Sequence, residues 1–247
     1  MMRSSNPVLG EKTFRDLAPA GVDSMSVQGT VNKTLFLLLG VLVAASWTWS
    51  MYFDFEDQAL VFPWMIGGAI GGLVIGLITA FKKTWAAFTA PLYALCQGLF
   101  LGGLSSTFEA RYPGIVIQAT ALTFGTMFAL LFAYTSRLIR ATENFKLGVA
   151  AATGGIFFVY MATMLLGFFG IQMPFIHESG LLGIGFSLFV VIIAALNLVL
   201  DFDFIENAVE AQAPKYMEWY AAFGLVVTLV WLYIEILRLL AKLRDRR

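Results

Sequence analysis

Seven long runs without a charged residue are the feature that most constrains this chain. About 20 apolar residues, at about 1.5 Å of helix each, cross a bilayer core about 30 Å thick. The runs are continuously apolar, whereas barrel strands alternate apolar and polar residues over about 10 positions. We therefore predict seven spanning helices, within Thr34–Phe53, Gln58–Phe81, Thr84–Phe108, Tyr112–Ser136, Leu147–Ile176, Ser179–Leu200 and Trp219–Ile234, the last resuming beyond Glu235 and Arg238 as far as Ala241.

Composition supports the same class and excludes others. Only 13% of the 247 residues are charged and 59% are hydrophobic, whereas about a quarter of a soluble domain is charged. The 16 basic and 16 acidic residues balance, which disfavours a nucleic-acid binder. A single Cys96 and a single His177 exclude an intrachain disulfide and an ordinary Cys/His metal cluster. We expect an all-α, polytopic membrane protein in contact with the lipid bilayer, with no resident cofactor and no nucleic acid.

The chain divides into a flexible polar tail over residues 1–32 and one seven-helix domain over residues 33–247. The tail lacks the short apolar core and cleavage site of a signal peptide. Positive charges in short loops mark the cytoplasmic side, and before the last helix Arg111 alone lies opposite the tail. We therefore expect a cytoplasmic N-terminus, because ten basic residues lie on that side: Arg3, Lys12, Arg15, Lys33, Lys82, Lys83, Arg137, Arg140, Lys146 and Lys215.

The last helix leaves two topologies open. Seven crossings carry Lys242 and the three arginines that follow it to the outside, against the charge rule. Either the early loops fix the topology, or the last segment does not cross fully. We favour seven crossings, because early loops usually dominate.

Glycines four residues apart predict close helix packing. The run GGAIGGLVIG contains several such pairs, and Gly98 with Gly102 repeats the spacing. Small residues at this spacing let helix backbones approach closely in a membrane. We interpret these positions as packing contacts with no chemical role.

Glu235 is the sharpest candidate for a functional residue, because an ionisable group within the bilayer is costly. Arg238 follows it by three residues and so shares its helix face. One interpretation is a local ion pair in which Arg238 reaches toward the membrane edge. The other is an acid that faces the interior of the bundle, and the sequence leaves both open.

Asp201 and Asp203 end the sixth apolar run. If the helix continues through LVLDFDFIENAVE, Asp203, Glu206 and Glu210 share one face, which we interpret as a solvated face. Asp201 then points elsewhere, on the side of Asn197. Asp201 is either part of a polar pair with Asn197 or simply the end of the apolar span.

The spacing of Asp201 and Glu235 strains any direct contact between them. A simple hairpin requires its turn near Glu218 to bring the two acids level, yet the turn signal is at Pro214. Contact therefore requires part of the segment from 204 to 219 to form an extra turn or to lie along the membrane surface.

The chain resembles the Bax inhibitor-1 family, the transmembrane Bax inhibitor motif proteins, in a bacterial branch. The resemblance rests on LVLDFDFIE in the sixth segment, LYIEILRLL in the seventh and CQGLFLGGLSS in the third, in this order. It implies a seven-helix bundle with a central last helix. It also implies a multi-pass protein of the bacterial plasma (inner) membrane with a role in ion homeostasis and stress response.

What the family implies about mechanism is a pH-sensitive calcium leak. Two carboxyls on the sixth and seventh helices share a proton and latch the pore, and these positions fall on Asp201 and Glu235. Lys82 stands where some relatives have a basic residue that helps to hold the closed state. Asp203, Asn197 and Arg238 are possible supporting residues. Ca²⁺ is then the permeant ion, with transient contacts to the two acids.

Three departures from the family pattern stand out. The seventh-helix acid is Glu instead of Asp, and the linker between the two acids is about ten residues longer than in short bacterial members. A residue near Gly71 replaces the second-helix glutamate of some relatives, which removes a possible pore ligand.

The proposed latch is physically coherent. Two adjacent carboxyls in a low-dielectric site cannot both ionise cheaply, so such a pair holds one proton. Raising the pH removes that proton, sets like charges against each other and opens the bundle to a hard cation. The sequence thus favours a pH-gated calcium leak.

The main alternative is a non-conducting regulator that binds other membrane proteins, such as a membrane protease. A secondary transporter is disfavoured because the segments show no repeat. We expect no enzyme activity, because GxSxG is absent and neither Ser105 nor Ser106 has an evident base.

Overall fold

A computed structural model describes residues 24–55, 58–170 and 180–246. Seven helices in these ranges are long and apolar enough to cross a membrane. Most of the predicted tail, residues 1–23, lies outside the described residues. The helices are α2 (Val27–Phe55), α3 (Gln58–Phe81), α4 (Ala86–Arg111), α5 (Ile115–Thr135), α6 (Glu143–Phe168), α8 (Leu181–Glu210) and α9 (Met217–Asp245), with a 3₁₀ turn, η1 (Lys83–Trp85), before α4.

The helices follow the predicted apolar runs and differ from them mainly at the ends. α2 begins at Val27, six residues before the predicted domain boundary. α6 ends at Phe168, well before the end of its apolar run. Gly170 follows with a φ of 74°, a left-handed conformation that commonly stops a helix and that glycine adopts without strain.

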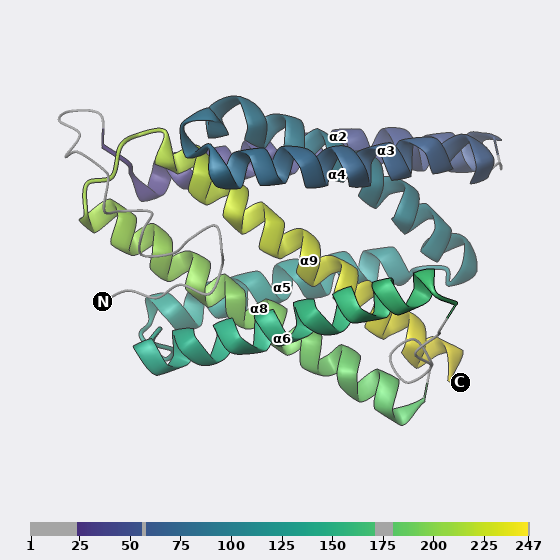
Figure 1. Ribbon diagram of the computed structural model, residues 1–247. Coiled ribbons are helices and arrows are strands. Elements are labelled where there is room, and N and C mark those ends of the chain that lie inside the picture. Colours follow the sequence, from purple (N-terminus) through teal and green to yellow (C-terminus); the bar gives the residue numbers. More distant parts are fainter. Residues whose placement is uncertain (1–23, 56–57, 171–179, 247) are drawn as a thin grey trace.

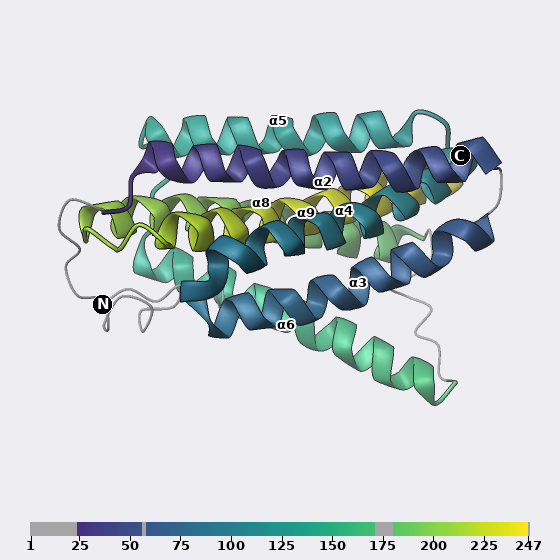
Figure 2. The same cartoon turned by 90° about the horizontal axis from the view of Figure 1, so that it is seen from above.

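α9 is the central helix of the bundle. It is the most buried of the seven spans and packs against α2, α4, α5 and α8. Figures 1 and 2 show it running through the middle of the other helices, from the end where α2 begins to the opposite end. With 29 residues, α9 is long enough for a full crossing, as the favoured topology requires.

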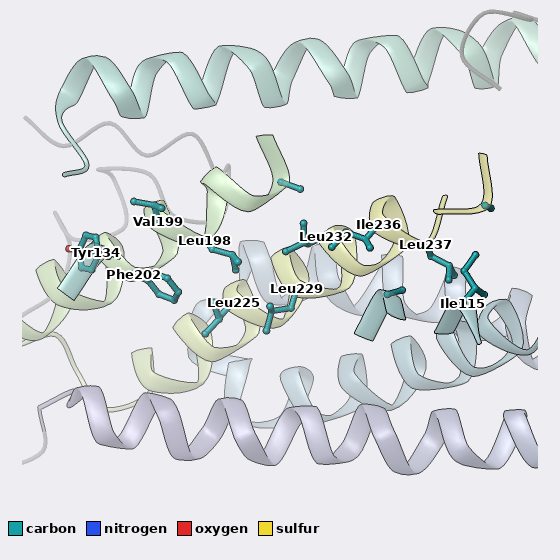
Figure 3. Close-up of a cluster of buried hydrophobic side chains, with 13 residues drawn as sticks. Ile115, Tyr134, Leu198, Val199, Phe202, Leu225, Leu229, Leu232, Ile236 and Leu237 are labelled. Carbon is teal, nitrogen blue, oxygen red and sulfur yellow. The ribbon is translucent and has the colours of Figure 1, made fainter. Parts of the chain in front are cut away.

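The main hydrophobic core lies along α9. Leu225, Leu229 and Leu232 recur at three- and four-residue spacing, which places them on one helix face. They pack with Leu198 and Phe202 of α8, as Figure 3 shows. This core fixes α8 beside α9 and sets the depth of the acids that the two helices carry.

The predicted glycine contacts hold α4 against its neighbours. A Cβ built on Gly98 would collide with the backbone of α2 at Val41, and one on Gly102 would collide with Thr48. Gly68 of α3 lies equally close to the backbone of Cys96 in α4. Helices α2, α3 and α4 therefore form a tightly packed unit in which these glycines are required by close backbone approach.

Candidate functional site: buried carboxyls in the bundle

Glu235 lies inside the bundle, with only 2% of its surface exposed. Its two carboxylate oxygens accept hydrogen bonds from the Tyr160 hydroxyl of α6, at 3.0 and 3.1 Å. Arg238, one turn further along α9, donates to the same carboxylate at 3.1 Å. Glu235 therefore faces the interior of the bundle and is also ion-paired with Arg238, so the two interpretations of the sequence are compatible.

Arg238 connects this buried acid to the surface of the bundle. Its side chain is 50% exposed while that of Glu235 is buried. Its guanidinium also lies 5.8 Å from the centre of the Tyr160 ring, a cation–π distance. Long basic side chains commonly bury their stems and keep their charge in a polar region. Tyr160 and Arg238 together stabilise a charge that the interior would otherwise exclude.

A cavity of about 330 Å³ adjoins Glu235. It lies toward the end of the bundle where α9 finishes, between α4, α6, α8 and α9. Both signs of charge line it, from Arg111, Arg238 and Lys242 and from Glu235 and Asp245. The remaining lining residues are Thr107, Phe108, Tyr112, Tyr160, Phe186, Ser187 and Ala241. The buried carboxylate of Glu235 therefore borders an open space that is lined in part by charged and polar side chains.

Asp201 is also buried, with 1% of its surface exposed. It lies nine residues before the end of α8, whereas Glu235 lies eighteen residues after the start of α9. Because the two helices form an antiparallel hairpin, Asp201 and Glu235 differ in depth by about 13 Å. The bond from Lys242 Nζ to Ser187 Oγ (2.8 Å) fits this register.

The offset between the acids follows from the turn that joins α8 to α9. α8 stops at Glu210 and α9 starts at Met217. The Ala213 amide donates back to the carbonyl of Ala208 at 3.0 Å, which closes the end of α8. The connection thus contains no extra helical turn that would bring the acids level. A proton shared directly between Asp201 and Glu235 stays a prediction for another conformation.

Asn197 faces α6. Its amide nitrogen donates to the Thr153 hydroxyl at 2.9 Å and to the Ile193 carbonyl at 2.8 Å. Asn197 lies one turn before Asp201, and both are buried. Both residues of the predicted polar pair are therefore enclosed within the bundle.

The acidic face of α8 is paired, which corrects the interpretation of it as solvated. Lys146 of α6, itself buried, donates to Asp203 at 2.6 Å. Arg137 donates to Glu206 at 2.7 Å. Only Glu210 is exposed. The sequence pattern located the face correctly, but the basic residues that pair with it come from α6 and from the connection between α5 and α6, which the periodicity of α8 cannot reveal.

Lys82 is exposed at the turn between α3 and α4. Its amide donates to the carbonyl of Ile78, and its carbonyl accepts from Trp85. The next residue, Lys83, lies over the ring of Tyr220 in α9, 5.9 Å from its centre. Lys83 is therefore the basic residue of this pair whose ammonium group reaches the central helix.

Glu218 is a buried acid that the sequence analysis missed. Only 1% of its surface is exposed, and it accepts bonds from the amide and hydroxyl of Ser26, each at 3.0 Å. Lys33 of α2 forms an ion pair with it. A Cβ on Gly29 would collide with the Glu218 carboxylate, so this glycine makes the approach possible. No local pattern signals this site, because Ser26 and Lys33 lie more than 180 positions from Glu218 in the sequence.

A second, apolar cavity of about 460 Å³ lies between α2, α4, α5 and α9. Ser105 and Tyr233 line it, and their hydroxyls are 2.7 Å apart in a hydrogen bond. This bond gives Ser105 a partner between α4 and α9. Among the described residues, no group of three or more His, Cys, Asp or Glu side chains is placed to hold a metal ion.

These features define the class of protein: a multi-pass, all-helical membrane protein with a central last helix that carries a buried acid. Residues 6–245 match the family described as Bax inhibitor 1 like, and the chain belongs to that family. This confirms the resemblance drawn from the sixth and seventh segments. It also agrees with the all-α, seven-helix fold. No curated protein and no solved structure matches the chain.

Proposed function

We propose that this protein is a pH-sensitive leak for calcium across a bacterial plasma (inner) membrane, with its N-terminus in the cytoplasm. It acts without a resident cofactor and without catalysing a reaction. The observation that carries the proposal is the burial of two carboxyls, Asp201 and Glu235, on the two most buried helices of the bundle. Buried ionisable groups within a membrane commonly mark ion or proton pathways.

The sign of the pH effect follows from the location of the acids. Loss of the proton from the buried Asp201 creates a charge without its hydration shell. Water and a hard cation then satisfy that charge better than apolar side chains do. Acidic groups along a pathway also favour cations over anions. We therefore expect the leak to increase as the pH rises.

Each acid acts at its own level in the conformation described above. Glu235 is held by Tyr160 and Arg238 beside the 330 Å³ cavity, and Asp201 lies about 13 Å closer to the end of the bundle where α8 meets α9. A latch in which they share one proton requires α8 to move along α9 by about 13 Å, the depth by which they differ. Substitution of either acid alone therefore changes the pH response in both arrangements.

The test is calcium flux into dye-loaded proteoliposomes at a series of pH values from about 6 to 8, the range in which the shared-proton mechanism would operate. The parent is compared with Asp201→Asn and Glu235→Gln. Glu210→Gln is the matched control, because Glu210 is an exposed acid on the same helix as Asp201. We expect the first two substitutions to alter the pH profile and the control to leave it unchanged. Parent-like profiles for both acid variants would refute the proposal.

The second candidate is a non-conducting regulator of other membrane proteins, such as a membrane protease. The observation that favours it is the exposure of α6, the least buried of the seven spans, which packs mainly against α8. Absence of flux at every pH from folded, correctly inserted protein would favour this role. Site-specific photo-crosslinkers at exposed positions of α6 in intact cells would then identify what contacts it.

A further inference from the structure

Three polar residues of α6 repeat at a spacing of seven. They are Lys146, Thr153 and Tyr160. Seven residues are close to two full turns, so the three side chains lie on one helix face. They extend over fourteen residues, or about 20 Å of helix, which is most of the hydrocarbon thickness.

Each of these residues contacts a polar side chain of the inner helices. Lys146 pairs with Asp203 at 2.6 Å, and Thr153 accepts from Asn197 at 2.9 Å. Tyr160 donates to Glu235 at 3.0 Å. We call this row of three contacts the α6 seam. It continues into the cavity beside Glu235, since Tyr160 and Glu235 both line that cavity.

The rest of α6 is loosely packed. A Cβ built on Gly148, Gly154 or Gly155 would meet nothing within 4 Å, in contrast to one on Gly68 of α3 or Gly98 of α4. Its apolar contacts with α8 centre on a small cluster around Ile156 and Val190. Figure 2 shows the C-terminal half of α6 diverging from α8 and α9.

These two properties make the α6 seam the interface that opens most easily. Water replaces a hydrogen bond between polar side chains with little loss, because it supplies donors and acceptors of its own. A close-packed apolar or glycine interface gains nothing from water and loses its packing contacts. The seam also carries two acids, Asp203 and Glu235, whose carboxylates suit hydrated cations once water separates them from Lys146 and Arg238.

We propose that the hydrated pathway through the bundle is the α6 seam, and that α6 is the helix that moves away from α8 to open it. The pathway would pass Asp203, Asn197 and Glu235 in turn and end in the 330 Å³ cavity. The assignment of cations as the permeant species rests on the proposed function above. The location of the pathway rests on the contacts of α6 alone.

The first test is the access of water to the α6 seam. In a Cys96→Ser background, Thr153→Cys lies in the seam, whereas Phe158→Cys replaces an exposed side chain of the same helix. Ala94→Cys probes the tightly packed α2–α4 interface. A small, cationic, membrane-impermeant methanethiosulfonate reacts only with thiolates that water reaches. At about pH 8, where an opened seam ionises the thiol, we expect Thr153→Cys to react at least about tenfold faster than the other two.

The second test locks the moving helix. A short bis-methanethiosulfonate joins Thr153→Cys to Asn197→Cys through a disulfide at each cysteine and should stop the leak until these disulfides are reduced. The control pair is Gly40→Cys with Ala94→Cys, joined by oxidation to a disulfide, because a Cβ on Gly40 would lie 3.8 Å from that of Ala94 and this separation suits a disulfide. This control joins α2 to α4 and should leave the leak unchanged.

The outcomes separate this inference from the proposed function. Rapid labelling at Thr153→Cys without any calcium leak supports the seam and refutes the calcium leak alone. A pH-dependent leak with Thr153→Cys as slow as Phe158→Cys overturns the seam. A leak that survives the α6–α8 cross-link also overturns it, because the proposed pathway would then be closed.

Discussion

Glu218 offers the sharpest test of how the bundle is held together. Its carboxylate accepts two hydrogen bonds from Ser26 and an ion pair from Lys33, and it is buried. These contacts join the start of α2 to the start of α9. Glu218→Gln keeps the size of the side chain but removes its charge, so Lys33 loses its partner. We therefore expect a large loss of stability.

The size of that loss follows from the contacts. Removing one partner of a buried pair costs about 3 to 5 kcal/mol. Lys33 keeps 19% of its side-chain surface exposed, so water partly compensates it. The amide oxygen of Gln can take the place of Oε1, which accepts both bonds from Ser26. We expect a decrease of about 2 to 4 kcal/mol in the free energy of unfolding.

Steric trapping in lipid bicelles measures that free energy. Glu210→Gln is the matched control, since Glu210 is exposed and a surface change is worth about 0.5 kcal/mol or less. A double-mutant cycle that combines Glu218→Gln with Lys33→Met measures the interaction energy between the two side chains. Hydrogen exchange should also quicken in the first turns of α2. A loss for Glu218→Gln no larger than that of the control, or a zero coupling to Lys33, would contradict the reasoning.

Two further predictions concern packing and the site. Gly98→Ala should lower the free energy of unfolding by about 1 to 3 kcal/mol, because its Cβ collides with the backbone of α2. Gly125→Ala has open space around it and should be neutral or stabilising. Equal losses for the two variants in bicelle unfolding would refute this. Tyr160→Phe should weaken the attachment of α6 by about 0.5 to 2 kcal/mol and raise the leak at a given pH, because it removes the hydroxyl bound to Glu235. Unchanged flux from folded Tyr160→Phe would count against a role for this bond.

Much of the fold was predictable because the bilayer restricts what an apolar run can become. Without water, backbone groups must bond within a helix, so each charge-free run of sufficient length predicts one helix. The helix ends were less predictable. α6 ends at Phe168 although apolar residues continue, because a left-handed glycine at Gly170 stops it. Residues 171–176 of that run lie outside the described residues.

The sequence identified the residues of the candidate site better than it identified the residues that contact them. The pairing of Glu235 with Arg238 followed from helical spacing, whereas its burial was one of two alternatives that the sequence left open. The Tyr160 contact depends on how α6 crosses α8 and α9, which no local pattern specifies. Asp203 is paired with Lys146 across 57 positions of sequence, so the face it shares looked solvated. Long-range partners of this kind are set by tertiary packing.

The most direct test of the proposed function is the pH profile of calcium flux in the double variant Asp201→Asn/Glu235→Gln, beside the parent in the same liposomes. Both side chains keep their size and lose the ability to titrate. We predict a leak that rises with pH in the parent and a flat profile in the double variant. A double variant that leaks with the parent's pH dependence would contradict the account, because neither acid would then control the pathway.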